Sequence, residues 1–187
     1  MDYDLTECQR RNIDAIVRNG GLEFPEQFVL YTSGTIGPYF IQSIVIEKNG
    51  KDYRYAIDSI IDLINETIDY GYDIISGGET RDWDFSNPVA FALEKAHAKL
   101  YKDGKILGAN MKYSRVLHVA DLNNKGSFPR DSWIPMIEKE GGYINDIFFF
   151  VDRMEEGVNV LKDMDLKSHS IVQLDGAAWD YLLETEK

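Results

Sequence analysis

A chain of 187 residues is long enough for one domain with a sizeable core and is short for two. Its 20 lysines and arginines face 32 aspartates and glutamates. The resulting net charge of -12 predicts a protein that repels nucleic acid and anionic membranes, so any bound phosphate must be held locally. The single cysteine, Cys8, excludes an internal disulfide and a thiolate metal cage. The N-terminus lacks a signal-peptide pattern, and no apolar run approaches the roughly 20 residues that span a bilayer, so we expect a cytoplasmic protein.

The first 71 residues are expected to hold two helices with a pair of strands between them. Ile13, Ile16 and Val17 recur at helical spacing after Thr6, and the glycines at 20–21 end this pattern. Residues 28–46 are largely β-branched or aromatic, which predicts two strands around a turn at 33–38, and a second turn follows at 49–50. A long helix is expected from 53 to about 71, because isoleucines mark one face: Ile57, Ile60, Ile61, Ile64 and Ile68.

Three strand–helix units follow along the chain. Strands are expected at 72–76, 115–120 and 144–151, and the helices that follow them at 88–98, 128–140 and near 155–164. Pro88 would stand in the first turn of its helix, where its missing N–H costs little. Alternating strands and helices of this length predict parallel crossovers, and therefore an α/β fold with a central sheet covered on both faces.

Ligands of such sheets bind beyond the carboxyl ends of the strands, which directs attention to the loops after Ser76, Ala120 and Val151. In the first loop, 77–87, Gly77 and Gly78 would let backbone N–H groups approach a ligand, and Arg81 is a possible phosphate partner. The alternative is a surface loop that uses glycine for its turn.

The second loop carries a more specific pattern, an aspartate followed by a polar turn with glycine and a serine placed to open a helix. A helix N-terminus behind such a turn presents N–H groups and a positive dipole end to a phosphate monoester. The alternative is that Asp121 only ends the strand and Ser127 only caps the helix. The residues of this pattern are Asp121, Asn123, Asn124, Lys125, Gly126 and Ser127.

The remaining reactive or aromatic residues favour structural roles. His97 is expected on the surface of a helix, His118 inside the core, and His169 near a strand start without the partners of a zinc site, so no metal-ligating residues are predicted. Trp83 and Phe85 are expected in the first loop, where they would cover a ligand or pack on a dimer partner.

Four segments together resemble the type I phosphoribosyltransferases, and most of all the orotate phosphoribosyltransferases. The resemblance covers nearly the whole chain. Its segments are the hood residues 28–34 with Pro38-Tyr39-Phe40, the Lys-rich segment 102–108, the loop 116–127 that binds phosphoribosyl pyrophosphate (PRPP), and the segment 151–157.

The resemblance implies a single domain over 1–187, with a core at about 52–172 and a hood formed by about 22–48 plus the C-terminal segment. It implies transfer of a phosphoribosyl group from PRPP to orotate or a related base, with Mg²⁺ as cofactor, pyrophosphate as the leaving group, and a homodimer. It places Asp121 on the ribose. Lys102 and Lys105 would lie on a flexible loop that enters the partner's site.

The other site residues follow from the same resemblance. Asn123, Asn124, Lys125, Gly126 and Ser127 would cradle the 5′-phosphate; Gly77, Gly78 and Arg81 would meet pyrophosphate; Tyr39, Phe40 and Arg153 would contact the base.

The sequence departs from the family pattern at two informative positions. Ala120 stands where the family has the first of two adjacent acids, and Leu107 stands where it has a loop histidine. Two hypotheses therefore remain: a phosphoribosyltransferase, and a PRPP- or nucleotide-binding regulatory protein that kept the fold and lost turnover.

Overall fold

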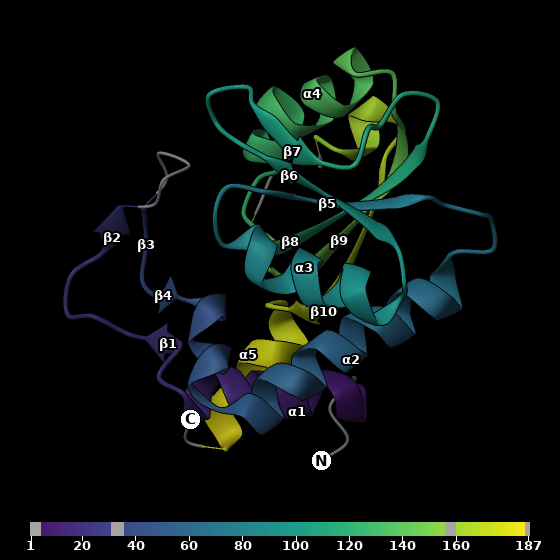
Figure 1. Ribbon diagram of the computed structural model, residues 1–187. Coiled ribbons are helices and arrows are strands. Elements are labelled where there is room, and N and C mark those ends of the chain that lie inside the picture. The colour runs from purple at the N-terminus through teal and green to yellow at the C-terminus, as the bar shows by residue number, and fades with distance from the viewer. Residues whose placement is uncertain (1–4, 31–35, 156–159, 186–187) are drawn as a thin grey trace.

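The computed structural model describes residues 5–30, 36–155 and 160–185, which form a three-layer α/β structure around one six-stranded sheet (Figure 1). The strand order is β10-β9-β8-β5-β6-β7, and every pair is parallel except β6 with β7. The strands are β5 (Ile74–Gly78), β6 (Ala96–Leu100), β7 (Ile106–Gly108), β8 (Arg115–Asn123), β9 (Tyr143–Asp152) and β10 (Lys167–Gln173). This confirms the predicted α/β fold with a mainly parallel sheet.

Helices cover both faces of the sheet (Figure 1). On one face lie α1 (Glu7–Arg18), α2 (Gly50–Thr67), α3 (Asp82–Ala92) and α5 (Gly176–Glu184). On the other face, the π-helical turn Pro129–Trp133 continues into α4 (Ile134–Lys139), and the 3-10 turn Lys162–Met164 lies nearby. The expected helix at 128–140 is confirmed with a π segment at its start. Of the helix expected near 155–164, residues 156–159 lie outside the described part, and the described remainder holds only that 3-10 turn.

The core consists of two clusters separated by the sheet. Phe148 and Phe150 of β9 pack in one cluster, and Phe149 between them packs in the other. All three side chains are almost fully buried. This is the pattern of a parallel strand covered on both faces, as the apolar run predicts.

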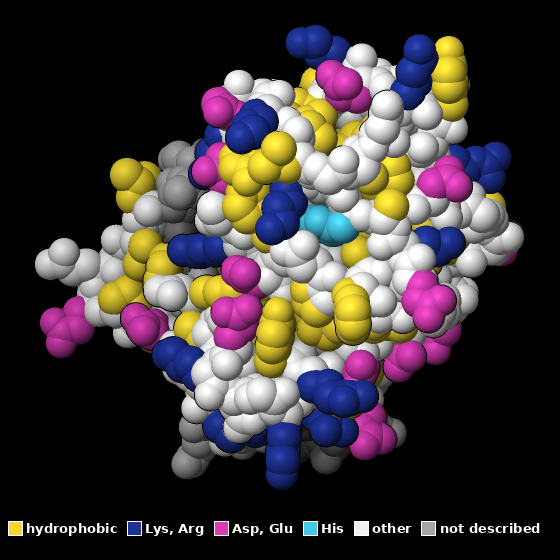
Figure 2. All heavy atoms as spheres, in the orientation of Figure 1, with side chains coloured by type: hydrophobic (Ala, Val, Ile, Leu, Met, Phe, Trp, Pro, Cys, Tyr) yellow, Lys and Arg dark blue, Asp and Glu magenta, His cyan; other side chains and the backbone are white. Residues whose placement is uncertain are grey.

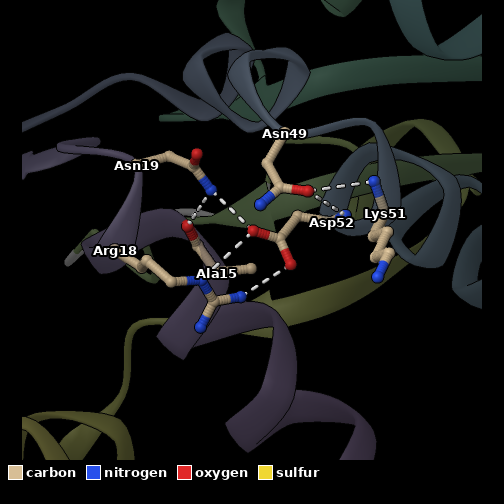
Figure 3. Close-up of polar contacts among 6 residues, drawn as sticks. All are labelled: Ala15, Arg18, Asn19, Asn49, Lys51 and Asp52. Atoms are coloured by element: carbon tan, nitrogen blue, oxygen red, sulfur yellow. Dashed lines mark hydrogen bonds and ion pairs between the residues drawn. The ribbon is translucent and has the colours of Figure 1, made fainter.

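Local hydrogen bonds fix the start of α2 and its contact with α1 (Figure 3). The Asn49 side chain accepts from the N–H groups of Lys51 and Asp52, so Asn49 is an N-cap and not part of the turn expected at 49–50. Asp52 in turn accepts from Arg18, with 2.6 Å between Nη2 and Oδ1, and from Asn19 at 2.9 Å. These bonds join the last turn of α1 to the first turn of α2.

The hood is built from short antiparallel pairs beside the sheet (Figure 1). β1 (Leu22–Glu23) pairs with β4 (Phe40–Ile41), and β2 (Val29–Leu30) pairs with β3 (Ile36–Gly37). The strand expected to reach residue 46 ends at Ile41, and Ser43–Lys48 form a 3-10 helix. Residues 31–35, which include much of the expected turn, lie outside the described part.

The C-terminal helix α5 packs against one side of the hood, and the strands β2 and β3 carry exposed hydrophobic side chains. Trp179 of α5 packs against Tyr39, with ring centroids 4.8 Å apart, and against Phe24 at 6.3 Å. Phe28, Leu30 and Ile36 are exposed, and Figure 2 shows hydrophobic side chains on this side of the molecule.

The helix expected at 88–98 is wrong in its bounds. The structure places α3 at Asp82–Ala92 with Pro88 inside it, and residues 96–100 form β6. Pro88 has no N–H for the carbonyl of Asp84, and the hydroxyl of Tyr53 on α2 donates to that carbonyl instead. The Tyr53 hydroxyl thus replaces the backbone donor that Pro88 lacks, and the helix can begin at Asp82, before the predicted start at residue 88. The sequence patterns also left β7 and α5 unpredicted.

Candidate active site

A cavity of about 320 Å³ opens at the carboxyl ends of the adjacent strands β5 and β8. The chain runs from β5 outward to β7 and then returns to β8, so the cavity lies where the strand order reverses, the expected ligand position in an open α/β sheet. Its polar and charged walls come from Glu79, Thr80, Arg81, Asp82, Lys102, Asp121 and Asn124. Four predicted site residues therefore meet here, namely Arg81, Lys102, Asp121 and Asn124.

Asp121 is almost fully buried in the wall of this cavity. It belongs to β8, because this strand extends to Asn123 and not only to residue 120 as predicted. Its carboxylate accepts a hydrogen bond from Ser43 Oγ at 3.0 Å. Burial and the neighbouring Asp82 raise the pKa of Asp121 to about 7. Carboxyl groups with strongly raised pKa values cluster at functional sites, so this shift in a cavity wall makes Asp121 a candidate functional residue.

Asp82 faces Asp121 from the first residue of α3. It accepts from the N–H of Asp121 at 3.1 Å and from the N–H of Gly78 at 3.0 Å. Asp82 was not among the predicted site residues, because residues 77–87 were expected to form a loop. The available signal was an acidic residue in the first turn of a helix, a favourable position for a negative charge, but it could be used only if the helix was known to begin at Asp82.

Gly77 and Gly78 are buried residues of β5 and not members of an open loop. A Cβ at Gly77 would lie 2.2 Å from Ser86 Oγ, and one at Gly78 would lie 2.2 Å from the Trp133 ring. The N–H of Gly78 is donated to Asp82. Close packing therefore explains these two glycines, and the expectation that their N–H groups are open to a ligand is corrected. The next three residues, Glu79 to Arg81, line the cavity instead.

The two aromatic residues expected in that loop belong to α3 and differ in their burial. Phe85 is fully buried and stacks on Phe150 with centroids 5.1 Å apart. The Trp83 indole donates to the carbonyl of Gly77 at 2.8 Å and packs against Tyr101. Phe85 is therefore a core residue, which corrects its expected role, whereas Trp83 is only partly buried and its expected role stays a prediction.

The turn after β8 is closed by its own side chain. Asn123 accepts from the N–H of Gly126 at 2.9 Å and donates to Asp152 at 2.8 Å. Gly126 has a φ of +67°, and a Cβ there would lie 2.6 Å from Val160. Both the backbone conformation and the close packing therefore require glycine at this position. Lys125 is exposed at the tip, and the helical segment begins at Ser127. Asn123 therefore shapes the predicted phosphate cradle, while Asn124 faces the cavity.

Lys102 and Lys105 lie in the short hairpin turn between β6 and β7, the segment expected to form the flexible loop. Tyr101 N–H donates to the carbonyl of Lys105 at 2.9 Å, and Gly104 N–H donates to the carbonyl of Tyr101 at 3.0 Å. The N–H of Lys102 donates to Glu79 at 2.9 Å. Lys102 lines the cavity of its own chain, and Lys105 does not line it.

Arg153 connects the hood to the turn after β8. Its Nε lies 3.0 Å from the hydroxyl of Tyr39 and 3.2 Å from Oε1 of Glu155, and its Nη1 lies 3.5 Å from Oδ1 of Asn124. The Arg153 side chain is only 4% exposed. Tyr39, Phe40 and Arg153 do not line the cavity, although Arg153 contacts Asn124, which does. The ion pair with Glu155 is the alternative to a ligand-binding role for Arg153.

The histidines differ in how well they were predicted. His97 is half-buried on β6 and not on a helix surface; its Nε2 lies 2.9 Å from Ser86 Oγ, and burial, with Lys99 and His118, lowers its pKa to about 4. His118 is fully buried, as expected, with Nδ1 2.9 Å from Ser76 Oγ. His169 pairs with Asp146 at 2.7 Å.

Across the described residues no three His, Cys, Asp or Glu side chains are grouped so that they could hold a metal ion. In the same part of the chain, no helix is both long and apolar enough to cross a membrane.

Comparison with known proteins supports the resemblance found in the sequence. No protein-family model matches the chain. The adenine phosphoribosyltransferase of Caldicellulosiruptor saccharolyticus is 26% identical over 160 residues, which cover 74% of this chain and 88% of that protein. The structure of the orotate phosphoribosyltransferase of Aeropyrum pernix is similar with a TM-score of 0.79 and 18% identity, covering 94% of this chain and 99% of that one.

A second solved structure is the orotate phosphoribosyltransferase of Mycobacterium tuberculosis H37Rv in complex with PRPP. It is similar with a TM-score of 0.68 and 17% identity, covering 91% of this chain and 99% of that one. The strand order, the hood and these similarities agree, and the chain has the type I phosphoribosyltransferase fold.

Proposed function

We propose that this protein is a phosphoribosyltransferase that binds PRPP in the cavity between β5 and β8 and transfers the phosphoribosyl group to a nitrogenous base. The observation that carries the proposal is the meeting of Arg81, Lys102, Asp121 and Asn124 in one cavity at the point where the strand order reverses. The PRPP complex of a similar structure supports this choice of substrate.

The residues of the cavity suit the charges of the reaction. As the base attacks the anomeric carbon and pyrophosphate leaves, positive charge develops on the ribose and negative charge on the leaving group. Asp121 would hold the ribose hydroxyls and face the positive charge. Arg81 and Lys102, on the loops that follow the neighbouring strands β5 and β6, would neutralise pyrophosphate in a protein whose net charge otherwise repels it.

The 5′-phosphate would lie at the turn 124–127, where the helical segment begins. The side chain of Asn123 closes this turn, and Gly126 gives it the positive φ that it needs. The helix start adds N–H donors and a positive dipole end, and Lys125, within the turn, adds a cation.

The donor set of the cavity fits Mg²⁺ that is held mainly by the substrate. Magnesium keeps several waters and binds through one or two carboxylates together with substrate phosphates, so it needs no cage of protein ligands. Glu79 is the carboxylate on the loop that we assign to pyrophosphate, and it would reach an ion there. When bound, the ion would stabilise the charge that develops on pyrophosphate.

The base is orotate or a related base in this proposal, and an uncharged purine such as adenine is the second candidate. Arg153, whose guanidinium matches a carboxylate in shape, favours orotate. Its ion pair with Glu155 and the adenine phosphoribosyltransferase relative favour an uncharged base. We place the base between Tyr39 and Asn124, the two groups that Arg153 joins.

The experiment is product analysis after incubation with PRPP, Mg²⁺ and a panel of bases that includes orotate and adenine. Formation of a nucleotide and pyrophosphate supports the proposal, and the base consumed names the substrate. PRPP binding without product on any base would select the regulatory protein instead.

A further inference from the structure

The cavity contains a carboxylate beside Asp121 that the family motifs do not mark. Asp82 is 9% exposed and lines the cavity beside Asp121, although the two residues come from α3 and β8. Ala120, where the family pattern has an acid, lines the same cavity. Position 120 thus lacks the acid of the family pattern, but Asp82 of α3 provides a carboxylate in the same cavity.

Two backbone hydrogen bonds and a buried histidine fix the orientation of the Asp82 carboxylate. Its Oδ1 accepts from the N–H of Asp121 and its Oδ2 from the N–H of Gly78, at 3.1 and 3.0 Å. His118 is fully buried beneath it with Nε2 3.6 Å from Oδ2, and that nitrogen has no hydrogen-bond partner in the part of the chain that the structure describes. The carboxylate is therefore held in place by buried groups.

The exposed side of Asp82 is turned to the cavity. Its side chain is 12% exposed, and each oxygen uses one acceptor position for a backbone N–H. A carboxylate oxygen has a second lone pair, so Asp82 can still accept from a ligand. Asp121 lies beside it and accepts from Ser43 Oγ with Oδ2, which leaves that oxygen a second lone pair as well.

We propose that Asp82 is the second ribose-binding carboxylate of this protein, and that it does from α3 what an acid at position 120 would do from β8. The inference rests on the proposed function. The vicinal hydroxyls of a ribose are both donors, and two carboxylates side by side accept one each in strong, charge-assisted hydrogen bonds. Of the three acidic residues that line the cavity, Asp82 and Asp121 are joined by a hydrogen bond from the N–H of Asp121 to Asp82, whereas Glu79 accepts from the N–H of Lys102.

A second role for Asp82, bracing the loop after β5 against β8, predicts a different pattern of ligand affinities. Bracing would affect every ligand of that loop, including pyrophosphate, which has no ribose. A ribose contact would affect only ligands that carry both hydroxyls. Calorimetric titration with ribose 5-phosphate, 2-deoxyribose 5-phosphate and pyrophosphate separates the two roles without any turnover.

The variants are Asp82→Asn, the matched control Asp84→Asn and the double variant Asp82→Asn with Ala120→Asp. Asp84 lies in the same first turn of α3 and outside the cavity wall. We expect Asp82→Asn to weaken ribose 5-phosphate binding by about tenfold or more, the scale of one lost charged hydrogen bond. Binding of pyrophosphate should change little, the preference over the 2-deoxy sugar should shrink, and Asp84→Asn should bind like wild type. Ala120→Asp should restore part of the lost affinity.

Three results would overturn the proposal. They are unchanged ribose 5-phosphate affinity in folded Asp82→Asn, an equal loss for pyrophosphate and ribose 5-phosphate, and wild-type protein that binds none of the ligands. If Ala120→Asp does not fold, the comparison of the two sugars decides. Failure of the proposed function appears separately, as absence of nucleotide product from a wild type that binds PRPP.

Discussion

Arg153 and Glu155 form an ion pair in the interior of the protein, with 3.2 Å between Nε and Oε1 and side-chain exposures of 4% and 13%. The pair sets the charge beside Tyr39 and Asn124, which Arg153 also contacts. A carboxylated base must share the guanidinium with Glu155, whereas an uncharged base need not.

Removing the charge of Glu155 should therefore change the preference between bases. In Glu155→Gln, we expect the affinity for orotate to rise about tenfold relative to adenine, because the guanidinium keeps its charge and loses a competing anion. Arg153→Ala should do the reverse and cost orotate on the order of 2 kcal/mol. Competition binding with both bases in the presence of pyrophosphate measures the ratio. A ratio that neither variant changes would place the base away from Arg153.

The exposed Lys125 gives the test of the phosphate turn. Lys125→Glu should weaken binding of ribose 5-phosphate by about tenfold, since it reverses a charge next to the helix start that we assign to the 5′-phosphate. Lys139→Glu, which makes the same change at the end of α4, is the control. Equal affinities of both variants, with the fold intact by circular dichroism, would remove the turn from the site.

The hairpin between β6 and β7 predicts that each chain supplies its own lysine. Lys102→Ala should lower kcat by about tenfold or more with a smaller effect on KM, because a cation helps most as charge develops on pyrophosphate. Lys105→Ala should have less effect, since Lys105 does not line the cavity.

Mixing experiments test the same point across subunits. Mixed Lys102→Ala and Asp121→Asn proteins should not recover activity, because an intact site needs both residues in one chain. Recovery toward a quarter of the wild-type activity, the fraction expected for about one in four restored sites, would show that the lysine acts in a partner's site.

The raised pKa of Asp121 predicts how activity depends on pH. Burial and Asp82 bring this pKa to about 7. The ionised form accepts from the ribose hydroxyls, so kcat/KM for PRPP should rise as pH increases through about 7. Asp82→Asn removes the neighbouring negative charge and should shift the rise to lower pH. A flat profile from about pH 5.5 to 8.5 would contradict the role of Asp121 as an acceptor.

The same pKa has the opposite effect on stability. In the folded state Asp121 binds its proton more tightly than in the unfolded chain, so the free energy of unfolding falls as pH rises from the ordinary aspartate pKa of 3.8 through about 7. Asp121→Asn removes this loss, so the variant should gain stability relative to wild type between pH 4 and pH 8, by up to about 4 kcal/mol for a shift of this size. Urea unfolding at the two pH values checks the sign.

The parts of the site that were predictable are local in sequence. The turn 121–127 lies within one segment, and the buried run 148–151 identifies its strand by its apolar residues alone. Asp82 could not be found this way, because its importance depends on Asp121, 39 residues away, and on a helix that begins before Pro88. The bond that permits this helix comes from Tyr53, 31 residues from Asp84, and no local pattern records it.

Pro88 makes α3 dependent on α2. A helix normally satisfies its own carbonyls and can fray alone, but the carbonyl of Asp84 has its donor on Tyr53. The first turn of α3 and the facing turn of α2 should therefore open together, with similar protection of their amides against hydrogen exchange. The end of α3 that carries Asp82 then belongs to a cooperative unit anchored in α2, and its stability follows that of the helix layer and not that of the loop before it.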